Sequence, residues 1–167
     1  MKKQINFLVI LLFCSIISCK SDDDNCCRVI ESSILIQVEN KNGENLIDPQ
    51  NAVFDMSEIK IFYAPSKDGK RVEVDNPQLD VSKGFEIIVP DGNSNESYRL
   101  KLFLNVESIS ENGYSYTFIQ WSDNITDELR TEFDLSNNNI VAKKIWLNGE
   151  LEWQGNKEVL LIIKKKS

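Results

Sequence analysis

The stretch Tyr98-Arg99-Leu100-Lys101-Leu102-Phe103-Leu104-Asn105-Val106 places apolar side chains at every second position. This period of two predicts a β-strand with one buried face. A second run of the same kind, 114–121, follows Asn112-Gly113, a dipeptide typical of hairpin turns. We therefore predict that 98–106 and 114–121 pair as one antiparallel hairpin, and that strands build the rest of the chain.

The same alternation extends in both directions along the sequence. Residues 33–40 carry Ile34, Ile36 and Val38 on one face. Residues 45–56 have no clear period, and we expect them to connect two sheets. The other predicted strands are 58–64 and 71–75, joined as a hairpin by the turn residues 66–69, and then 85–89, 140–147, 150–153 and 158–164.

One segment, 127–133, fits a helix as well as a strand. Ile125, Leu129 and Phe133 follow one another at a spacing of four, which is helical, but charged and apolar residues also alternate along the segment. We predict a strand, because the polar run 137–139 then serves as a turn into 140–147.

Short strands separated by Gly, Asn and Asp turns indicate an all-β protein, and the chain has no sustained helical period and no internal repeat. We predict one domain, residues 29–167, folded as an antiparallel β-sandwich of immunoglobulin-like or transthyretin-like type. A closed barrel is the alternative.

The last three predicted strands are expected to form one unit with two apolar faces. If both connecting turns are tight, Trp146 and Trp153 share one face, and Leu147 and Leu161 share the other. Only one face can pack inside a two-layer sandwich, so we predict that the face with Leu147 and Leu161 is a contact surface. If that face is interior instead, the tryptophan face is the exposed one, and carbohydrate binding becomes the better interpretation.

The N-terminus has the composition of a secretory signal peptide. Lys2 and Lys3 precede an apolar run over 5–17, which is shorter than the roughly 20 residues of a membrane-spanning helix. The run ends in Ile16-Ile17-Ser18-Cys19, which resembles the lipobox of bacterial lipoproteins. The resemblance implies that residues 1–18 are removed and that Cys19 carries lipid, which would anchor the protein to a membrane. The alternative is an ordinary signal peptide with an incidental cysteine.

Residues 19–28 are polar and acidic, and we expect a flexible tether there. Ser21, Asp22, Asp23 and Asp24 resemble the acidic export signal of surface lipoproteins of the Bacteroidota. This resemblance implies a location in the outer membrane, at the cell surface. The alternative is a solvated acidic spacer without a signal.

The chain is acidic, with 167 residues and a formal net charge of -7. Lys2 and Lys3 are the only charges before Cys19, so removing them changes the charge from -7 to -9. An acidic protein repels phosphate backbones, so nucleic acid is excluded as an expected partner. A neutral or cation-rich partner, such as an envelope protein or a polysaccharide, is easier to accommodate.

Two cysteines remain in the mature chain, since Cys14 leaves with the signal peptide and Cys19 carries the lipid. Cys26 and Cys27 are adjacent and precede the first strand, so they cannot cross-link the distant parts of the fold. A disulfide between neighbours, an intermolecular bridge and two free thiols all stay open. Two adjacent cysteines without a second pair do not make the usual four-ligand zinc site.

The chain contains no histidine, which excludes Ser-His-Asp and Cys-His catalysis and every histidine-ligated metal site. A hydrolase that uses two carboxylates is not excluded, but no pair stands out from ordinary surface charge. Asp91 to Glu96 begins like a calcium loop and then departs from the EF-hand pattern. We expect no metal, no cofactor and no catalytic residue.

Trp121, Trp146 and Trp153 are the remaining candidates for a binding site, because indole rings stack on sugars and fill pockets in protein interfaces. Two binding functions compete with the hydrolase that uses two carboxylates, which a cleft lined by two close carboxylates would favour. The first is a non-catalytic surface lipoprotein that acts as an interaction or structural module, and the second is a carbohydrate-binding module that uses exposed tryptophans. The solvent exposure of the three rings separates these hypotheses.

Overall fold

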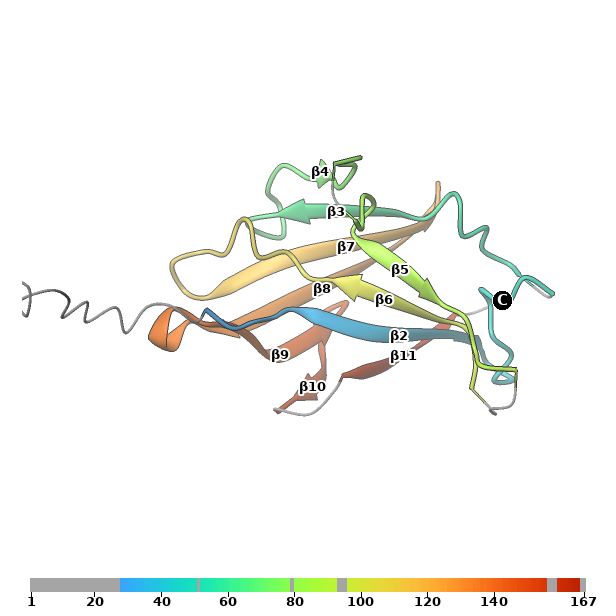
Figure 1. Ribbon diagram of the computed structural model, residues 1–167. Helices are drawn as coiled ribbons and strands as arrows, with labels where there is room; N and C mark the ends of the chain where they lie inside the picture. The colour runs from blue at the N-terminus through green and yellow to red at the C-terminus, as the bar shows by residue number, and fades with distance from the viewer. Residues whose placement is uncertain (1–27, 51, 79, 93–95, 156–158, 166–167) are drawn as a thin grey trace, which may run out of the picture.

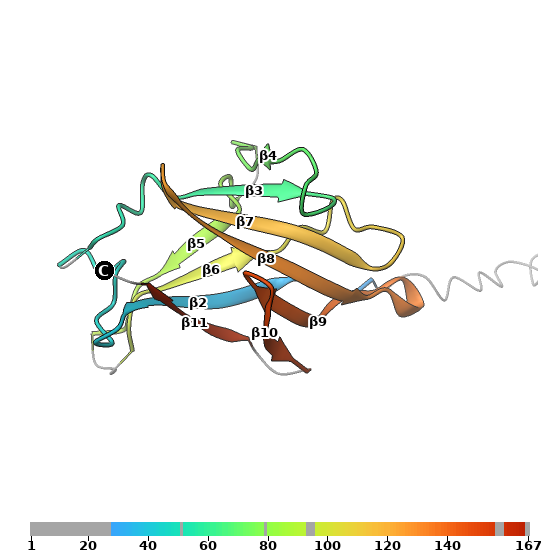
Figure 2. The same ribbon diagram turned by 180° about the vertical axis from the view of Figure 1, so that it is seen from behind.

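The computed structural model describes residues 28–50, 52–78, 80–92, 96–155 and 159–165, which form two β-sheets packed face to face. The large sheet has the strand order β1-β9-β8-β7-β3-β4, and β10 also pairs with β9. The small sheet has the order β11-β2-β6-β5. In Figure 1 the small sheet lies in front of the large sheet, and Figure 2 shows the two sheets from behind.

The large sheet consists of β1 (Ile30–Glu31), β3 (Lys60–Ala64), β4 (Val72–Glu73), β7 (Tyr114–Ser122), β8 (Ile125–Asp134), β9 (Ile140–Leu147) and β10 (Glu150–Gln154). The small sheet consists of β2 (Ser33–Asn40), β5 (Phe85–Ile88), β6 (Arg99–Phe103) and β11 (Leu160–Lys165). The all-β prediction and the two-layer arrangement are therefore confirmed. The pairing is mostly antiparallel, but β1 runs parallel to β9 and β11 runs parallel to β2.

The core lies between the two sheets, where each strand buries every second side chain. In β2 and β6 these side chains are the aliphatic residues that the period of two predicted, and the large sheet supplies those that face them. The fully buried members include Ile34, Ile36, Ile61, Leu100, Leu102, Ile119, Leu129 and Ile145. The predicted connection 45–56 does cross between the sheets, since β2 belongs to the small sheet and β3 to the large sheet.

The predicted hairpin of 98–106 and 114–121 is wrong, although both strands exist. β6 lies in the small sheet and β7 lies in the large sheet, so the chain between them crosses the sandwich. The Asn112-Gly113 turn acts only locally, because the Gly113 N–H donates to the Ser110 carbonyl at 2.8 Å and Gly113 has φ of 78°. The turn directs the chain into β7 but does not pair β7 with β6.

Asn105 fixes the position of the chain where it crosses from β6 to β7. Its side-chain amide donates to the carbonyls of Ala64 and Tyr116 in the large sheet, at 3.0 and 3.2 Å, and its Oδ1 accepts from the backbone N–H of Ser108 at 3.1 Å. Asn105 is fully buried. A buried amide whose donors and acceptor are all paired fixes the backbone around it, so this residue sets where the chain leaves the small sheet.

The prediction of a strand over 127–133 is confirmed, because β8 pairs with β7 on one side and with β9 on the other. The polar run after β8 forms a short 3-10 segment, η2 (Ser136–Asn138), in which Asn137 and Asn138 have positive φ. Asparagine tolerates this backbone conformation better than most residues. The predicted turn into β9 is therefore also confirmed.

The β9–β10 hairpin forms at Asn148-Gly149 as predicted, with Trp146 opposite Leu151. The register then shifts between Leu151 and Trp153, so that Trp153 lies opposite Ile145 and not opposite Lys144. An extra residue in one strand moves every later side chain to the other face. The prediction that Trp146 and Trp153 share a face is therefore wrong.

The predicted three-stranded C-terminal unit is also wrong. β11 does not pair with β10 but joins the small sheet, where Leu161 lies opposite Ile36 and Ile163 lies opposite Val38. Leu161 is 4% exposed and packs in the core, and Leu147 is half-buried against that core from the large sheet. The supposed outer face is thus split between the two sheets and faces inward from both.

Two polar contacts tie the sheets together across the core. The Lys165 ammonium at the end of β11 pairs with the buried Asp127 carboxylate on β8. The Tyr63 hydroxyl on β3 donates to the Phe103 carbonyl on β6 at 2.9 Å. Burial raises the pKa of Tyr63 to about 12, and the nearby Glu107 charge acts in the same direction. Within the described part of the chain, no helix is long and apolar enough to cross a membrane.

Candidate functional site

The three tryptophans occupy three different environments. Trp121 on β7 is 1% exposed, and its Nε1–H donates to Asp127 Oδ2 at 2.7 Å. Its ring lies 5.6 Å from the Phe54 ring. Trp121 is therefore a core residue, and only Trp146 and Trp153 reach the surface, each half-buried and on opposite sides of the large sheet.

A first candidate surface is the outer face of the large sheet, which we call the aromatic face and define by Tyr114, Tyr116, Phe118, Arg130, Trp146 and Leu151. The members on β7, β8 and β9 point outward because their neighbours in each strand point into the core, and Leu151 lies on the same side because it is opposite Trp146. Phe118 is 1% exposed, because the Arg71 guanidinium lies over its ring. Strand register places four of them in one row across the sheet, in the order Tyr116, Arg130, Trp146, Leu151. The row ends at Leu151, which is 51% exposed.

Arg130 lies at the centre of the aromatic face. Its guanidinium is 4.0 Å from the centre of the Trp146 ring and 5.4 Å from that of Tyr114, and these two rings are themselves 6.1 Å apart. The Arg130 Nε is buried and has no hydrogen-bond partner in the described residues. Arginine stacked on aromatic rings in this way is a cation–π arrangement, which holds the guanidinium in place without neutralising it.

Two lysines next to the aromatic face are paired with glutamates, whereas Arg130 and the neighbouring Arg71 are in no ion pair among the described residues. Lys144 lies 3.0 Å from Glu132, and Lys67 lies 3.4 Å from Glu128. The Lys144 hydrogen bond lowers the pKa of Glu132 from its ordinary value, so this carboxylate stays charged.

Arg71 is held differently, with its guanidinium 3.7 Å from the centre of the Phe118 ring. Neither Arg71 nor Arg130 forms an ion pair with any carboxylate in the described ranges. The aromatic face and its rim therefore carry two positive charges, Arg130 and Arg71, that no ion pair in the described ranges compensates.

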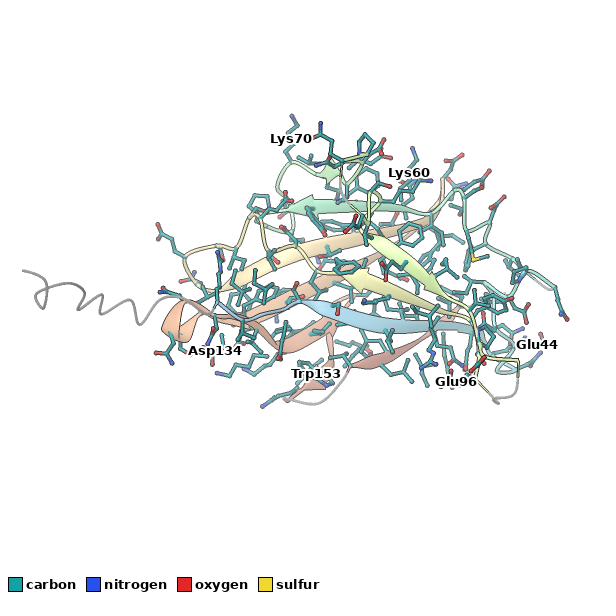
Figure 3. The ribbon with its side chains drawn as sticks, viewed as in Figure 1. Glu44, Lys60, Lys70, Glu96, Asp134 and Trp153 are labelled. Carbon is teal, nitrogen blue, oxygen red and sulfur yellow. The ribbon has the colours of Figure 1, made fainter. Side chains whose placement is uncertain are left out.

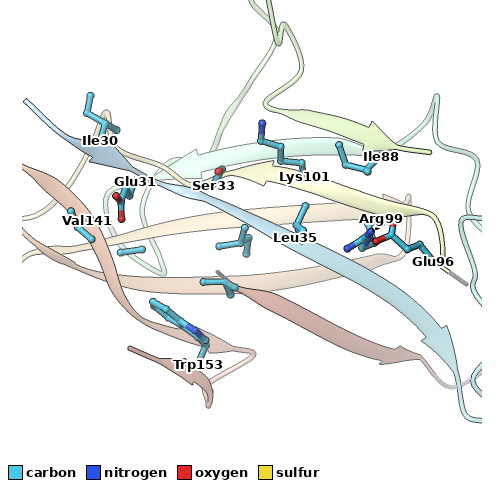
Figure 4. Close-up of a pocket in the computed structure, with 13 residues that line it drawn as sticks. Ile30, Glu31, Ser33, Leu35, Ile88, Glu96, Arg99, Lys101, Val141 and Trp153 are labelled. Atoms are coloured by element: carbon cyan, nitrogen blue, oxygen red, sulfur yellow. Dashed lines mark ion pairs between the residues drawn. The ribbon is translucent and has the colours of Figure 1, made fainter. Parts of the chain in front are cut away.

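A second candidate surface is a groove of about 730 Å³ at one edge of the sandwich, which we call the edge groove. It lies where β1, β9 and β10 of the large sheet approach β2 and β6 of the small sheet (Figure 4). Trp153 forms part of its wall together with aliphatic residues from both sheets. Trp153 and Glu96 lie along the same edge of the molecule in Figure 3.

Polar side chains line the rest of the edge groove. Arg99 pairs with Glu96 at 2.8 Å, and Lys101 pairs with Glu86 at 3.4 Å. Glu31 and Ser33 also line the groove. The groove thus combines one aromatic ring with several hydrogen-bond donors and acceptors.

Sequence patterns did not identify either surface. Arg130 and Tyr114 could have been found from the alternation of β8 and β7, because most outward positions of these strands are charged or aromatic, among them Tyr116, Phe118, Glu128 and Glu132. The edge groove had no such signal, since Glu31, Arg99 and Trp153 come from three distant segments. The pairing of β1 with β9, of β10 with β9 and of β2 with β6 brings them together.

The other predicted site residues are not brought into a site. Leu147 and Leu161 belong to the core. Cys19, Ser21 and the acidic run 22–24 lie outside the described residues, as do Cys26 and Cys27. In the described ranges no group of His, Cys, Asp or Glu is arranged to hold a metal ion. The calcium-like loop is described only in part, because 93–95 fall in a gap of those ranges.

No protein-family model matches this chain, and comparisons with curated proteins and with solved structures also found no match.

Proposed function

We propose that this protein is a non-catalytic, lipid-anchored module of a bacterial outer membrane that binds another envelope protein through its aromatic face. The β-sandwich, which we infer to be of immunoglobulin-like or transthyretin-like type, acts as the rigid support for that face. The observation that carries the proposal is Arg130, which is held between Trp146 and Tyr114 without a carboxylate partner.

The residue types of the aromatic face support a protein partner. Tryptophan, tyrosine and arginine are the residues most enriched at the energetic centres of protein interfaces. They bury a large area with few rotatable bonds, and Arg130 is already ordered by its ring contacts, so less entropy is lost on binding. Leu151 extends the same surface with an exposed apolar side chain.

The charges of the face define the chemistry of the partner. Arg71 and Arg130 lie in no ion pair among the described residues. A partner that presents carboxylates would form an ion pair with each of these two arginines. The net charge of -7 opposes an acidic partner at long range, but salt screens that repulsion over about 8 Å at physiological ionic strength. At contact distance the two arginines therefore favour a partner surface that presents carboxylates.

The proposed location rests on the N-terminal sequence. Lipidation at Cys19 would hold the domain at the membrane, and the acidic run 22–24 would direct it to the cell surface. We expect Cys19→Ala to release the protein from membranes and to stop incorporation of labelled fatty acid. Protease added to intact cells should remove the wild-type protein. Complete protection until lysis would place it in the periplasm.

Crosslinking on intact cells tests the partner, with the crosslinked proteins identified by mass spectrometry. Arg130→Glu should abolish recovery of the partner, because it places a carboxylate where the partner presents one. Lys164→Glu makes the same change of charge on the outer side of the small sheet, and it should leave recovery unchanged. Equal recovery with Arg130→Glu and with wild type would reject the proposed interface.

A further inference from the structure

We infer that the edge groove is a binding site for a neutral oligosaccharide, with Trp153 as the stacking platform. This inference is independent of the protein interface, because the groove and the aromatic face share no residue. A volume of about 730 Å³ falls within the range of roughly 300–1,000 Å³ that is usual for small-ligand sites. Figure 4 shows Trp153 on one side of the groove and the pair Glu96 and Arg99 towards its other end.

The bulge in β10 is what makes Trp153 available. Because the register shifts after Leu151, Trp153 lies on the same side of the large sheet as Ile145, at the edge where no β11 partner covers β10. The ring is only half-buried and lines the groove together with Val141. An indole face beside an aliphatic wall suits the C–H face of a sugar ring.

The polar lining matches the hydroxyl groups of a sugar, each of which both donates and accepts a hydrogen bond. Glu31 offers an acceptor, Ser33 offers a donor and an acceptor, and Arg99 offers donors. A sugar that enters the groove loses its hydrogen bonds with water, so the groove must offer both donors and acceptors to replace them.

The charges of the groove favour a neutral sugar over an acidic one. The two cations are already paired, Arg99 with Glu96 at 2.8 Å and Lys101 with Glu86 at 3.4 Å. Glu31 forms no ion pair with any described residue, so an incoming carboxylate would meet an uncompensated negative charge. A sugar acid therefore finds no free cation in this groove.

The same pairing argues for binding without turnover. Hydrolysis by two carboxylates needs one to act as an acid and the other as a base or nucleophile. Of the two glutamates that line the groove, Glu96 is engaged in an ion pair with Arg99 at 2.8 Å, which leaves Glu31 as the one carboxylate of the described lining without an ion pair. We expect the bound oligosaccharide to stay intact.

The three tryptophans provide a direct test, since each indole N–H gives its own NMR signal and each ring lies in a different place. We would titrate the ¹⁵N-labelled protein with hexasaccharides of glucose, mannose, xylose and N-acetylglucosamine, and with oligogalacturonate as the acidic comparison. At least one neutral hexasaccharide should shift the Trp153 signal while the signals of Trp121 and Trp146 stay in place. The ligand should be unchanged by mass spectrometry after the titration.

Two substitutions separate stacking from a structural role. Trp153→Ala should weaken the affinity at least about tenfold, whereas Trp153→Phe keeps an aromatic face and should recover part of the loss. Trp146→Ala on the opposite side of the large sheet should change the affinity less than about twofold. Melting temperatures would show which variants remain folded, and Glu31→Gln offers a second probe of the groove if Trp153→Ala does not fold.

The inference is overturned if no neutral hexasaccharide shifts the Trp153 signal at millimolar concentration, or if only oligogalacturonate does so. It is also overturned if Trp146→Ala weakens binding as much as Trp153→Ala. Because the partner test uses Arg130→Glu and this test uses Trp153, either proposal can fail while the other stands.

Discussion

At the scale of single residues, the most consequential contact is the buried carboxylate of Asp127. It is 3% exposed and accepts hydrogen bonds from the Trp121 indole and the Asn148 amide, at 2.7 and 3.0 Å, in addition to its ion pair with Lys165. A buried charge is tolerated only when its hydrogen-bonding capacity is filled. These contacts join β7, β8, β11 and the β9–β10 turn at one point.

We predict that Asp127→Asn lowers the free energy of unfolding by about 3 kcal/mol or more, because it leaves the Lys165 ammonium without its counter-charge. The neighbouring change Glu128→Gln serves as the control. It breaks only the Lys67 pair at the surface, and it should cost no more than about 1 kcal/mol. Urea unfolding of the domain measures both values, and equal costs would contradict this account.

The raised pKa of Tyr63 predicts that the free energy of unfolding falls at high pH. Its pKa of about 12 in the folded protein lies above its ordinary value of 10.0, so its contribution to stability is complete below pH 10 and is lost as the pH rises towards 12. Tyr63→Phe should destabilise the domain by about 1 kcal/mol at pH 8, because the Phe103 carbonyl loses its donor.

Between pH 10 and 12 the difference between Tyr63→Phe and wild type should shrink, since only the wild type carries the titrating hydroxyl. Urea midpoints at pH 8 and pH 11 measure the effect. Parallel losses of stability in the two proteins would show that Tyr63 is not the group responsible.

At the scale of elements, the sequence period located the strands well but did not identify their partners. Alternation in 33–40 and 140–147 gave the bounds of β2 and β9 as observed, because burial on one face is a local property of each strand. Pairing is not local. The sequence predicted a hairpin of β6 and β7, but the buried Asn105 amide directs the chain from one sheet to the other. No sequence period encodes that crossing.

The prediction of a three-stranded C-terminal unit was wrong for the same reason, because strand pairing is not a local property. The bulge between Leu151 and Trp153 cannot be read from side-chain types, since a shift of one residue leaves both tryptophans in plausible positions. The placement of β11 beside β2 is a contact between the two ends of the domain. The aromatic face could be predicted in part, because outward positions of β7 and β8 follow from their alternation, whereas the edge groove depends entirely on long-range pairing.

Neighbouring residues of β11 test its placement. Leu161 is buried and Ile162 is 50% exposed on the outer side of the small sheet. Leu161→Glu should destabilise the domain by about 3 kcal/mol or more, because it places an unpaired charge in the core. Ile162→Glu should change stability by no more than about 0.5 kcal/mol, as surface substitutions usually do. Thermal unfolding compares the two, and similar melting temperatures would contradict the observed sheet order.

At the scale of the whole molecule, the two-layer fold leaves two different surfaces available. The outer side of the large sheet carries the aromatic face, and the edge where the two sheets meet carries the edge groove. The opposite outer side, on the small sheet, exposes Leu160 and Ile162, and its cation–aromatic contact among the described residues is the looser pair of Lys101 over the Phe103 ring at 5.2 Å. This difference between the two outer sides is the basis for assigning the partner surface to the large sheet.

That assignment is tested most directly by a photoreactive amino acid placed at Leu151 or at Ile162, whose side chains are 51% and 50% exposed on opposite sides of the sandwich. After irradiation of intact cells, position 151 should give one discrete crosslinked product, and the linked peptide of the partner should be acidic. Arg130→Glu in the same chain should remove this product. A discrete product at position 162 with none at position 151 would contradict the account.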